Sequence, residues 1–196
     1  ISLAMAMAQM GRFDEAVGRL RDVIKHEPNN AEAHVQLGIT LLQRGNADQA
    51  ALEIREALRV SPADPMAHEI LASILRQQGR HAEAVQVLRE GMRLGPSALQ
   101  ANMLARLLAT SPDDSVRNGA EAVGLAEQVN RASGYSVPDV LDTVAAAYAE
   151  VGDFEKAVSV AKDALQRAMM QGRGDLAGPL KERLELYQAG RPYREE

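Results

Sequence analysis

The chain has 196 residues and a formal net charge of −5; 46% of its residues are hydrophobic, 25% charged and only 3% aromatic. These values are typical of a soluble globular or repeat protein and exclude an intrinsically disordered one. The negative charge excludes the basic surface that nucleic-acid binding requires, so no nucleic acid is expected as a partner. No apolar run reaches about eighteen residues, so no direct membrane insertion is expected. The absence of cysteine excludes disulfides, thiolate zinc sites and cysteine catalysis.

The apolar pattern predicts helices that are joined in pairs. Residues 31–44 contain almost no turn-forming residue, and apolar residues at helical steps of three and four resume over residues 50–58. We therefore expect two helices joined at Gly45, where the end of a helix favours a left-handed residue. Asn46 or the following turn is expected to cap the second helix, and Pro62 is expected to end it.

This helix pair recurs along the chain. Gly11, Gly45 and Gly79 lie 34 residues apart, and aligning the blocks gives three columns that persist through five copies. One column holds only alanine, one only small residues and one only apolar residues. They are Ala16, Ala50, Ala84, Ala122, Ala157; Ala4, Gly38, Ala72, Ala105, Ala145; and Leu3, Leu37, Leu71, Leu104, Val144. Such agreement predicts five copies of one packing unit.

We expect one all-α domain over residues 1–196, with the architecture of an α–α superhelix. Its helix–turn–helix repeats are expected at about 1–30, 31–64, 65–97, 98–135 and 137–171, with a capping helix at about 175–188. The first repeat begins in mid-helix, which favours a fragment of a longer protein. In the long loop of the fourth repeat, Asp113 and Asp114 are expected to form a turn and an N-cap. Arg183 is expected on the polar outer face of the capping helix.

Residues 31–64, AEAHVQLGITLLQRGNADQAALEIREALRVSPAD, resemble the tetratricopeptide repeat. The residues that carry the resemblance are Leu37, Gly38, Leu41, Gly45, Ala50, Ala57 and Pro62. His34 departs from the family pattern, in which a large aromatic residue stands near the start of the first helix. The resemblance covers almost the whole chain. It implies a solenoid that acts as a non-catalytic protein–protein interaction or scaffolding module.

A second resemblance leaves an alternative function open. The segments LARLLATSPDDSVRNGAEAVGLAEQV, GYSVPDVLDTVAAAYAEVGDFEKAV and LELYQAGRPYRE are similar to the C-terminal ends of bacterial tetratricopeptide arrays. Such arrays often follow a glycosyltransferase- or sulfatase-like enzyme, which implies a regulatory array of a larger bacterial enzyme whose catalytic part lies outside this chain. Homotypic self-assembly is a further alternative, because the ends of a solenoid expose apolar faces. The compartment is left open between the cytoplasmic and the periplasmic side.

In the tetratricopeptide family, five positions of the first helix of each repeat line a concave groove. The resemblance therefore implies a partner-binding groove lined by Val35, Ile39, Leu42, Gln43, Glu69, Ser73, Arg76, Gln77, Asn102 and Arg106. Continued along the chain, the same positions are Ala109 and Thr110, then Asp139, Asp142 and Glu150. Such a groove is apolar at its start, basic around Arg76 and Arg106 and acidic at its end. We expect it to bind a peptide or helix that has an apolar anchor and an acidic group reaching the two arginines.

The sequence offers little for catalysis or metal binding. Ser159 and Lys162 match the S-x-x-K pair of serine hydrolases, but they lie inside a helix and the companion motifs are missing. His34 and His68 share a column without a third ligand, so we expect them to fill the space of the family's aromatic residue. His81 is expected near an exposed turn. We expect no enzyme activity, no cofactor and no metal.

Overall fold

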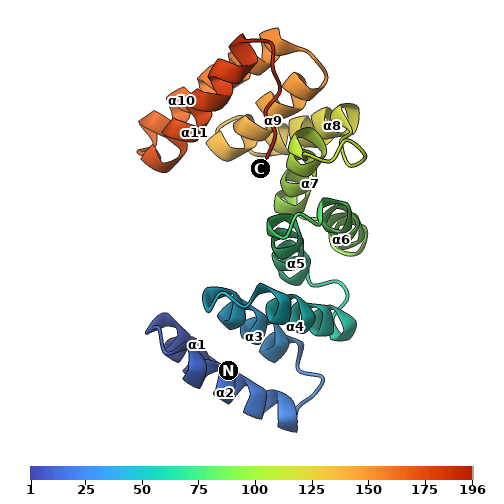
Figure 1. Cartoon of the computed structure of the whole chain (residues 1–196), viewed down its shortest axis with the longest axis vertical. Helices are drawn as coiled ribbons and strands as arrows, with labels where there is room; N and C mark the ends of the chain where they lie inside the picture. The colour runs from blue at the N-terminus through green and yellow to red at the C-terminus, as the bar shows by residue number, and fades with distance from the viewer. Residues whose placement is uncertain (196) are drawn as a thin grey trace. The chain divides into compact units, whose positions relative to one another are not determined.

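The computed structural model describes residues 1–195, which form eleven α-helices and no strand. These helices divide into two compact units, Ile1–Pro96 (unit 1) and Ser97–Glu196 (unit 2). Each unit is built of helical hairpins (Figure 1). The predicted all-α fold class is confirmed.

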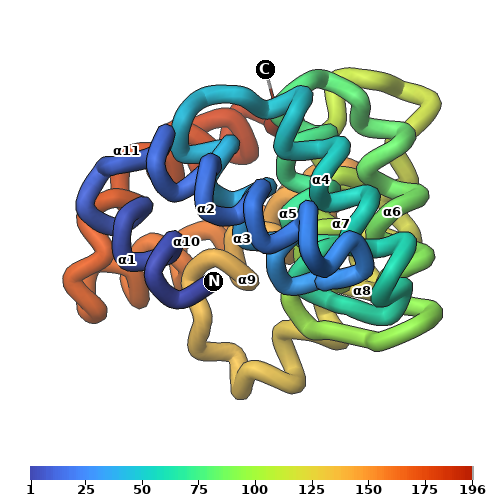
Figure 2. The backbone as a smooth tube through the Cα atoms, turned by 90° about the horizontal axis from the view of Figure 1, so that it is seen from below, coloured from blue at the N-terminus to red at the C-terminus, as the bar shows by residue number. Residues whose placement is uncertain are grey.

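Unit 1 contains three hairpins. They are α1 (Ser2–Gln9) with α2 (Phe13–His26), α3 (Ala31–Gln43) with α4 (Ala47–Val60), and α5 (Pro65–Gln77) with α6 (His81–Leu94). Within the unit, each helix packs against its neighbours in the sequence. Short turns reverse the backbone between the two helices of each hairpin (Figure 2). These hairpins coincide with the repeats expected at about 1–30, 31–64 and 65–97.

Unit 2 contains two hairpins and a last helix. They are α7 (Ala98–Thr110) with α8 (Gly119–Ala132), α9 (Pro138–Glu150) with α10 (Phe154–Met170), and α11 (Gly174–Gln188). Helix α9 packs against α7, α8 and α10, and α11 packs against α10 and more lightly against α9. The first helices of the two repeats, α7 and α9, are therefore direct neighbours. This contact decides the geometry of the charged side chains described below.

The helix ends follow the chemistry of the turns. Gly45 has φ +86°, a conformation that costs an L-residue with a side chain, and its N–H donates to the carbonyl of Leu42 at 2.9 Å. Asn46 occupies the N-cap position of α4, as expected, but its side chain makes no capping bond. At the start of α3, Asn30 does cap with its side chain, its Oδ1 accepting from the N–H of Ala33 at 2.9 Å.

Small residues form the contact between the helices of each hairpin. All five alanines of the first column, Ala16, Ala50, Ala84, Ala122 and Ala157, are 0% exposed. A Cβ atom added at Gly38 would lie 2.6 Å from Cδ1 of Ile54 and 3.3 Å from the carbonyl oxygen of Ala50. Glycine at this position leaves room for the Ile54 side chain, which would have to shift to admit a methyl group.

The long loop of the fourth repeat differs partly from expectation. Asp113 forms the predicted turn, since its Oδ1 accepts from the N–H of Ser115 at 2.9 Å. Asp114 does not cap α8: it forms an ion pair with Arg117. The N-cap is Asn118, whose Oδ1 accepts from the N–H of Glu121 at 3.2 Å. Asparagine in this position satisfies an N–H group that has no partner within the helix.

Candidate protein-interaction site

The partner-contact residues predicted in unit 1 lie on α3 and α5. Ile39, Leu42 and Glu69 are half-buried, and Gln43, Ser73, Arg76 and Gln77 are exposed. These seven residues are called the unit 1 contact residues below. Val35 corrects the prediction: it is 4% exposed, because α3 is packed on both α2 and α4 and this side chain faces the interior. Val35 therefore stabilises the unit and does not reach its surface.

Helices α3 and α5 also carry buried leucines on the side that packs into the unit. Leu37 and Leu41 of α3 and Leu71 and Leu75 of α5 are each 3% exposed or less. The helical period thus separates a packing face from an outward face on each helix. Among the unit 1 contact residues, α3 carries half-buried aliphatic side chains and α5 carries a cation, Arg76. An interface core of this composition can bind an apolar side chain that is accompanied by an acidic group.

In unit 2 the predicted cation Arg106 is already paired within the chain. Its Nη1 donates to Oδ2 of Asp142 at 2.7 Å, and its Nε donates to Oε1 of Glu195 at 2.9 Å. Arg183 of α11 also donates to Asp142. The four groups form a neutral network, the Arg106 network, in which the Asp142 side chain is 7% exposed. The expectation of an open basic surface at Arg106 is therefore corrected: two carboxylates of the same chain occupy it.

Electrostatics keeps Arg106 ionised. Burial lowers the pKa of Arg106, but the charges and hydrogen bonds of Asp142 and Glu195 outweigh it and raise that pKa above its ordinary value. Asn102, the other predicted contact residue of α7, is half-buried. A partner that is to bind here must therefore replace an existing ion pair, since Arg106 cannot lose its charge.

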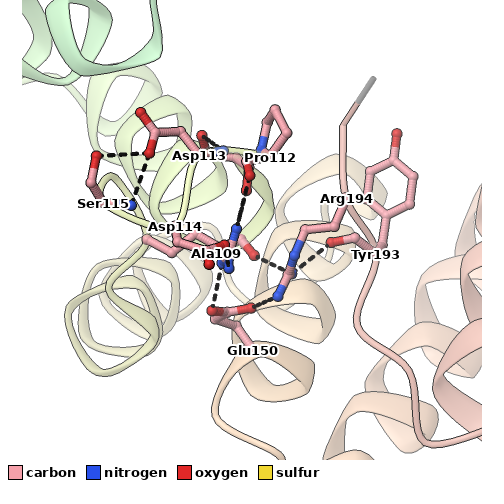
Figure 3. Close-up of polar contacts among 10 residues, drawn as sticks. Ala109, Pro112, Asp113, Asp114, Ser115, Glu150, Tyr193 and Arg194 are labelled. Carbon is pink, nitrogen blue, oxygen red and sulfur yellow. Dashed lines mark hydrogen bonds and ion pairs between the residues drawn. The ribbon is translucent and has the colours of Figure 1, made fainter.

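A second neutral cluster lies near the C-terminal ends of α7 and α9. Glu150, predicted as an acidic groove residue, pairs with Nε of Arg117 at 3.1 Å and with Nη2 of Arg194 at 2.6 Å. Arg117 also pairs with Asp114. Figure 3 shows Arg194 reaching from the segment after α11 to Glu150. We call these four residues the Glu150 network.

The segment Arg191–Glu195, called the return segment here, has no regular secondary structure and lies against α7. The N–H of Glu195 donates to the carbonyl of Thr110 at 2.9 Å, and Nη1 of Arg194 donates to the carbonyl of Ala109 at 3.3 Å. The guanidinium of Arg183 lies 4.6 Å from the ring centroid of Tyr193. The last carbonyls of α7, which have no partner in the helix, thus receive donors from the return segment.

Four charged residues of these networks were missed by the sequence analysis. Arg117, Arg194 and Glu195 fall outside the positions expected to face a partner, and Arg183 was assigned to the outer face of the capping helix. That assignment of Arg183 is wrong, because its side chain pairs with Asp142. One signal was available: the acidic positions 142 and 150 lie on a helix with many buried residues, where a carboxylate needs a cation.

The histidines have structural contacts. His34 is buried, with Nδ1 2.7 Å from Oε2 of Glu53 and Nε2 3.1 Å from the carbonyl of Pro28. His68 repeats the second contact, with Nε2 2.9 Å from the carbonyl of Pro62. The predicted packing role in place of an aromatic residue agrees with this burial. His81 corrects the prediction, because it is buried at the start of α6, where α6 packs on α5.

Within residues 1–195, no group of three or more His, Asp or Glu side chains is placed to hold a metal ion. Among the same residues, no helix is both long enough and apolar enough to span a membrane.

The chain is built of helical hairpins whose helices meet at buried alanines. Such repeated hairpins define an α-helical repeat scaffold. The family model of the tetratricopeptide repeat matches residues 1–59 and 35–98, which together cover half of the chain. The chain belongs to the tetratricopeptide repeat family. Arrays of this family are scaffolds for protein–protein interaction and are typically non-catalytic.

Solved structures share the fold at low sequence identity. MamA is 21% identical and matches with a TM-score of 0.74 over 88% of this chain and 98% of that one. YrrB, described as a tetratricopeptide protein with an unusual peptide-binding site, is 17% identical, with a TM-score of 0.72 over 93% and 90%. The thermophilic protein TTC0263 from Thermus thermophilus is 19% identical, with a TM-score of 0.63 over 96% and 97%. A search of curated proteins returned no match.

Proposed function

We propose that the chain is a non-catalytic scaffold that binds a peptide or helix of a partner protein through the unit 1 contact residues. The observation that carries the proposal is the set of exposed and half-buried side chains on α3 and α5, the first helices of two consecutive repeats. Ile39 and Leu42 offer half-buried aliphatic surface, and Arg76 offers an exposed cation from the next repeat. Aliphatic anchors supply most of the affinity of such an interface, whereas a charge supplies orientation and selectivity.

The chemistry of the partner follows from this composition. The expected ligand presents an apolar side chain to Ile39 and Leu42 and a carboxylate to Arg76. The peptide-binding site named for YrrB supports this reading by analogy of fold. Arg106 was also expected to receive an acidic group of the partner, but within unit 2 it is paired with Asp142 and Glu195.

The proposal can be tested by selecting ligands from a phage-displayed library of random peptides on the immobilised chain. The affinity of each selected peptide is then measured for the parent and for Leu42→Ser and Arg76→Glu variants. We expect both variants to bind at least about tenfold more weakly, as is common for central interface residues. Matched controls are Leu52→Ser on α4 and Arg21→Glu on α2, which change exposed residues away from the unit 1 contact residues. Equal binding by all five proteins, at equal melting temperatures, would place recognition elsewhere.

Homotypic self-assembly is the second candidate, and one observation favours it. Leu3 and Met10, at the start and just after the end of α1, are 59% and 62% exposed. Large apolar side chains at the surface favour association with a second copy. Sedimentation analysis over a hundredfold range of concentration tests this, because a mass that stays at one protomer removes the candidate. Variants Leu3→Ser and Met10→Ser should abolish any association seen.

A further inference from the structure

We propose that the return segment, Arg191–Glu195, is an internal ligand of unit 2, and that the surface beneath it binds an extended partner peptide with a basic residue directly followed by an acidic one. The proposal extends the proposed function, since it assigns a second peptide-binding surface. This surface lies on unit 2 and is occupied by the return segment of the same chain. It rests on the observed contacts of the return segment with α7 and α9.

The return segment is held as extended peptides are held by other proteins, through its backbone and its side chains together. Its backbone donates from the N–H of Glu195 to the carbonyl of Thr110 at 2.9 Å. The carboxylate of Glu195 pairs with Arg106 at 2.9 Å. The guanidinium of Arg194 pairs with Glu150 at 2.6 Å. Backbone bonds give affinity without sequence preference, whereas the two oppositely charged contacts select the side chains.

The surface that receives the return segment is the one expected to face a partner. Arg106, Ala109 and Thr110 are the last three partner-facing positions of α7, and Glu150 is the last such position of α9. The return segment contacts all four. Arg76 and Gln77 of unit 1 occupy the repeat positions that Ala109 and Thr110 occupy in unit 2. The internal contact therefore uses the repeat positions proposed for binding in unit 1.

The charges left after displacement define the ligand. Without Glu195, the Arg106 network keeps two arginines and one carboxylate, so it carries a net positive charge. Without Arg194, the Glu150 network keeps one arginine and two carboxylates, so it carries a net negative charge. The exposed surface would then present one positive and one negative site, at the spacing of two adjacent residues of an extended peptide. A ligand with the order basic–acidic fits these sites, and the reverse order meets like charges.

Helix α11 does not depend on these contacts alone. Leu180 and Tyr187 of α11 are buried against α9 and α10, and Arg183 pairs with Asp142 of α9. Tyr193 of the return segment packs against the same cluster as Tyr187, so release of the segment uncovers part of that cluster, whereas the packing of Leu180 and the pair of Arg183 with Asp142 do not involve the segment. A tethered ligand competes at a high effective concentration, so the parent chain is expected to mask the surface from free peptides.

The test uses a fluorescein-labelled peptide Gly-Arg-Pro-Tyr-Arg-Glu, the sequence of residues 190–195, and fluorescence anisotropy. The chain with Arg194→Ala and Glu195→Ala is expected to bind this peptide at least about tenfold more tightly than the parent does. The peptide Gly-Arg-Pro-Tyr-Glu-Arg has the same composition and should bind at least about tenfold more weakly. Adding Arg106→Gln to the double variant should abolish binding, whereas adding Arg76→Glu should leave it unchanged.

A second variant covers the case in which the double substitution unfolds unit 2. A protease-recognition sequence inserted between Arg191 and Pro192 leaves the contacts of residues 193–195 in place until it is cut. After cutting, the freed piece should separate on gel filtration, and the labelled peptide should then bind. A folded chain that binds neither peptide in either form, or binds both peptides equally, would make the return segment a fixed brace and overturn the proposal. The Arg76→Glu variant tests the unit 1 contact residues separately. The result for the return segment therefore does not depend on whether unit 1 binds a partner.

Discussion

Arg106 and Glu195 stand 89 residues apart in the sequence, yet Nε of Arg106 donates to Oε1 of Glu195 at 2.9 Å. This bond joins the first helix of unit 2 to the segment that follows its last helix. It also explains why the charge of Arg106, which was expected to pair with a partner protein, is already neutralised within the chain. The carboxylate predicted for a ligand of Arg106 is supplied by the chain itself.

The Arg106 network predicts the effect of losing its central carboxylate. Asp142→Asn leaves Arg183 without its carboxylate and Arg106 with Glu195 alone, and we expect the free energy of unfolding to fall by about 2–3 kcal/mol. Asp163→Asn is the matched control, since Asp163 pairs with Arg167 on the exposed side of α10 and its loss should cost less than about 0.5 kcal/mol. Urea denaturation followed by circular dichroism measures both. Similar losses for the two variants would contradict the structural role of the network.

The contact between α3 and α4 predicts an opposite outcome at two glycines. Gly38→Ala places a methyl group against Ile54 and should reduce the free energy of unfolding by about 1–3 kcal/mol. Gly18→Ala on α2 meets nothing within 4 Å and should stabilise the chain by about 0.5–1 kcal/mol, because alanine favours a helix.

A double-mutant cycle isolates the clash at Gly38. Since Ile54→Ala removes both atoms that crowd the new methyl group, Gly38→Ala should cost clearly less in that background than in the parent. Additive losses would show that the cost comes from the helix backbone and not from this contact.

The alanine column predicts a strict size limit at Ala50, which is fully buried between the helices of its hairpin. Ala50→Arg introduces an unpaired charge and excess volume, so we expect a loss of more than about 3 kcal/mol and a lower melting temperature. Gln49→Arg changes the exposed neighbouring residue and should alter the melting temperature little. An unchanged melting curve for Ala50→Arg would refute the alignment of the repeats.

Tyr187 predicts a loss of stability at alkaline pH. Its hydroxyl is buried without a hydrogen-bond partner among residues 1–195, and burial raises its pKa above the ordinary value of a tyrosine. As the pH rises, the unfolded chain therefore releases this proton before the folded chain does. The contribution of Tyr187 to the free energy of unfolding is fully present below about pH 10 and declines as the pH rises further. Denaturation midpoints measured across this range should fall less steeply for Tyr187→Phe than for the parent.

The same variant should cost no stability at neutral pH. Phenylalanine keeps the ring packed against Ala145 and Ala157 and removes an unpaired polar atom, so Tyr187→Phe should be neutral or stabilising by up to about 1 kcal/mol. Tyr187→Ala, which leaves a cavity, should lose about 3–5 kcal/mol. A large loss for Tyr187→Phe would indicate that the hydroxyl has a partner.

Much of the fold could be predicted because its rules are local and repeated. The spacing around Gly38, Ala50 and Ala57 reports packing that recurs in each hairpin, and α3, α4 and α5 begin at or next to the residues expected. The candidate site in unit 1 follows from the same register, except at Val35, where the interior position of α3 overrides it. The position of His81 was missed because one side chain at a helix start can face either way.

The sequence by itself determined the helical repeat and its hairpin turns, because these depend on residues within about 34 positions of one another. Only the tertiary structure decided which charges meet. Asp142 and Glu150 each collect two arginines from separate elements, and Glu195 returns from beyond α11 to Arg106 on α7. Such pairs carry no periodic signal, since a charge is neutralised by whichever opposite charge the packed helices bring within reach. Packing therefore left Arg106 and Glu150 of unit 2, which were expected to face a partner, paired within the chain.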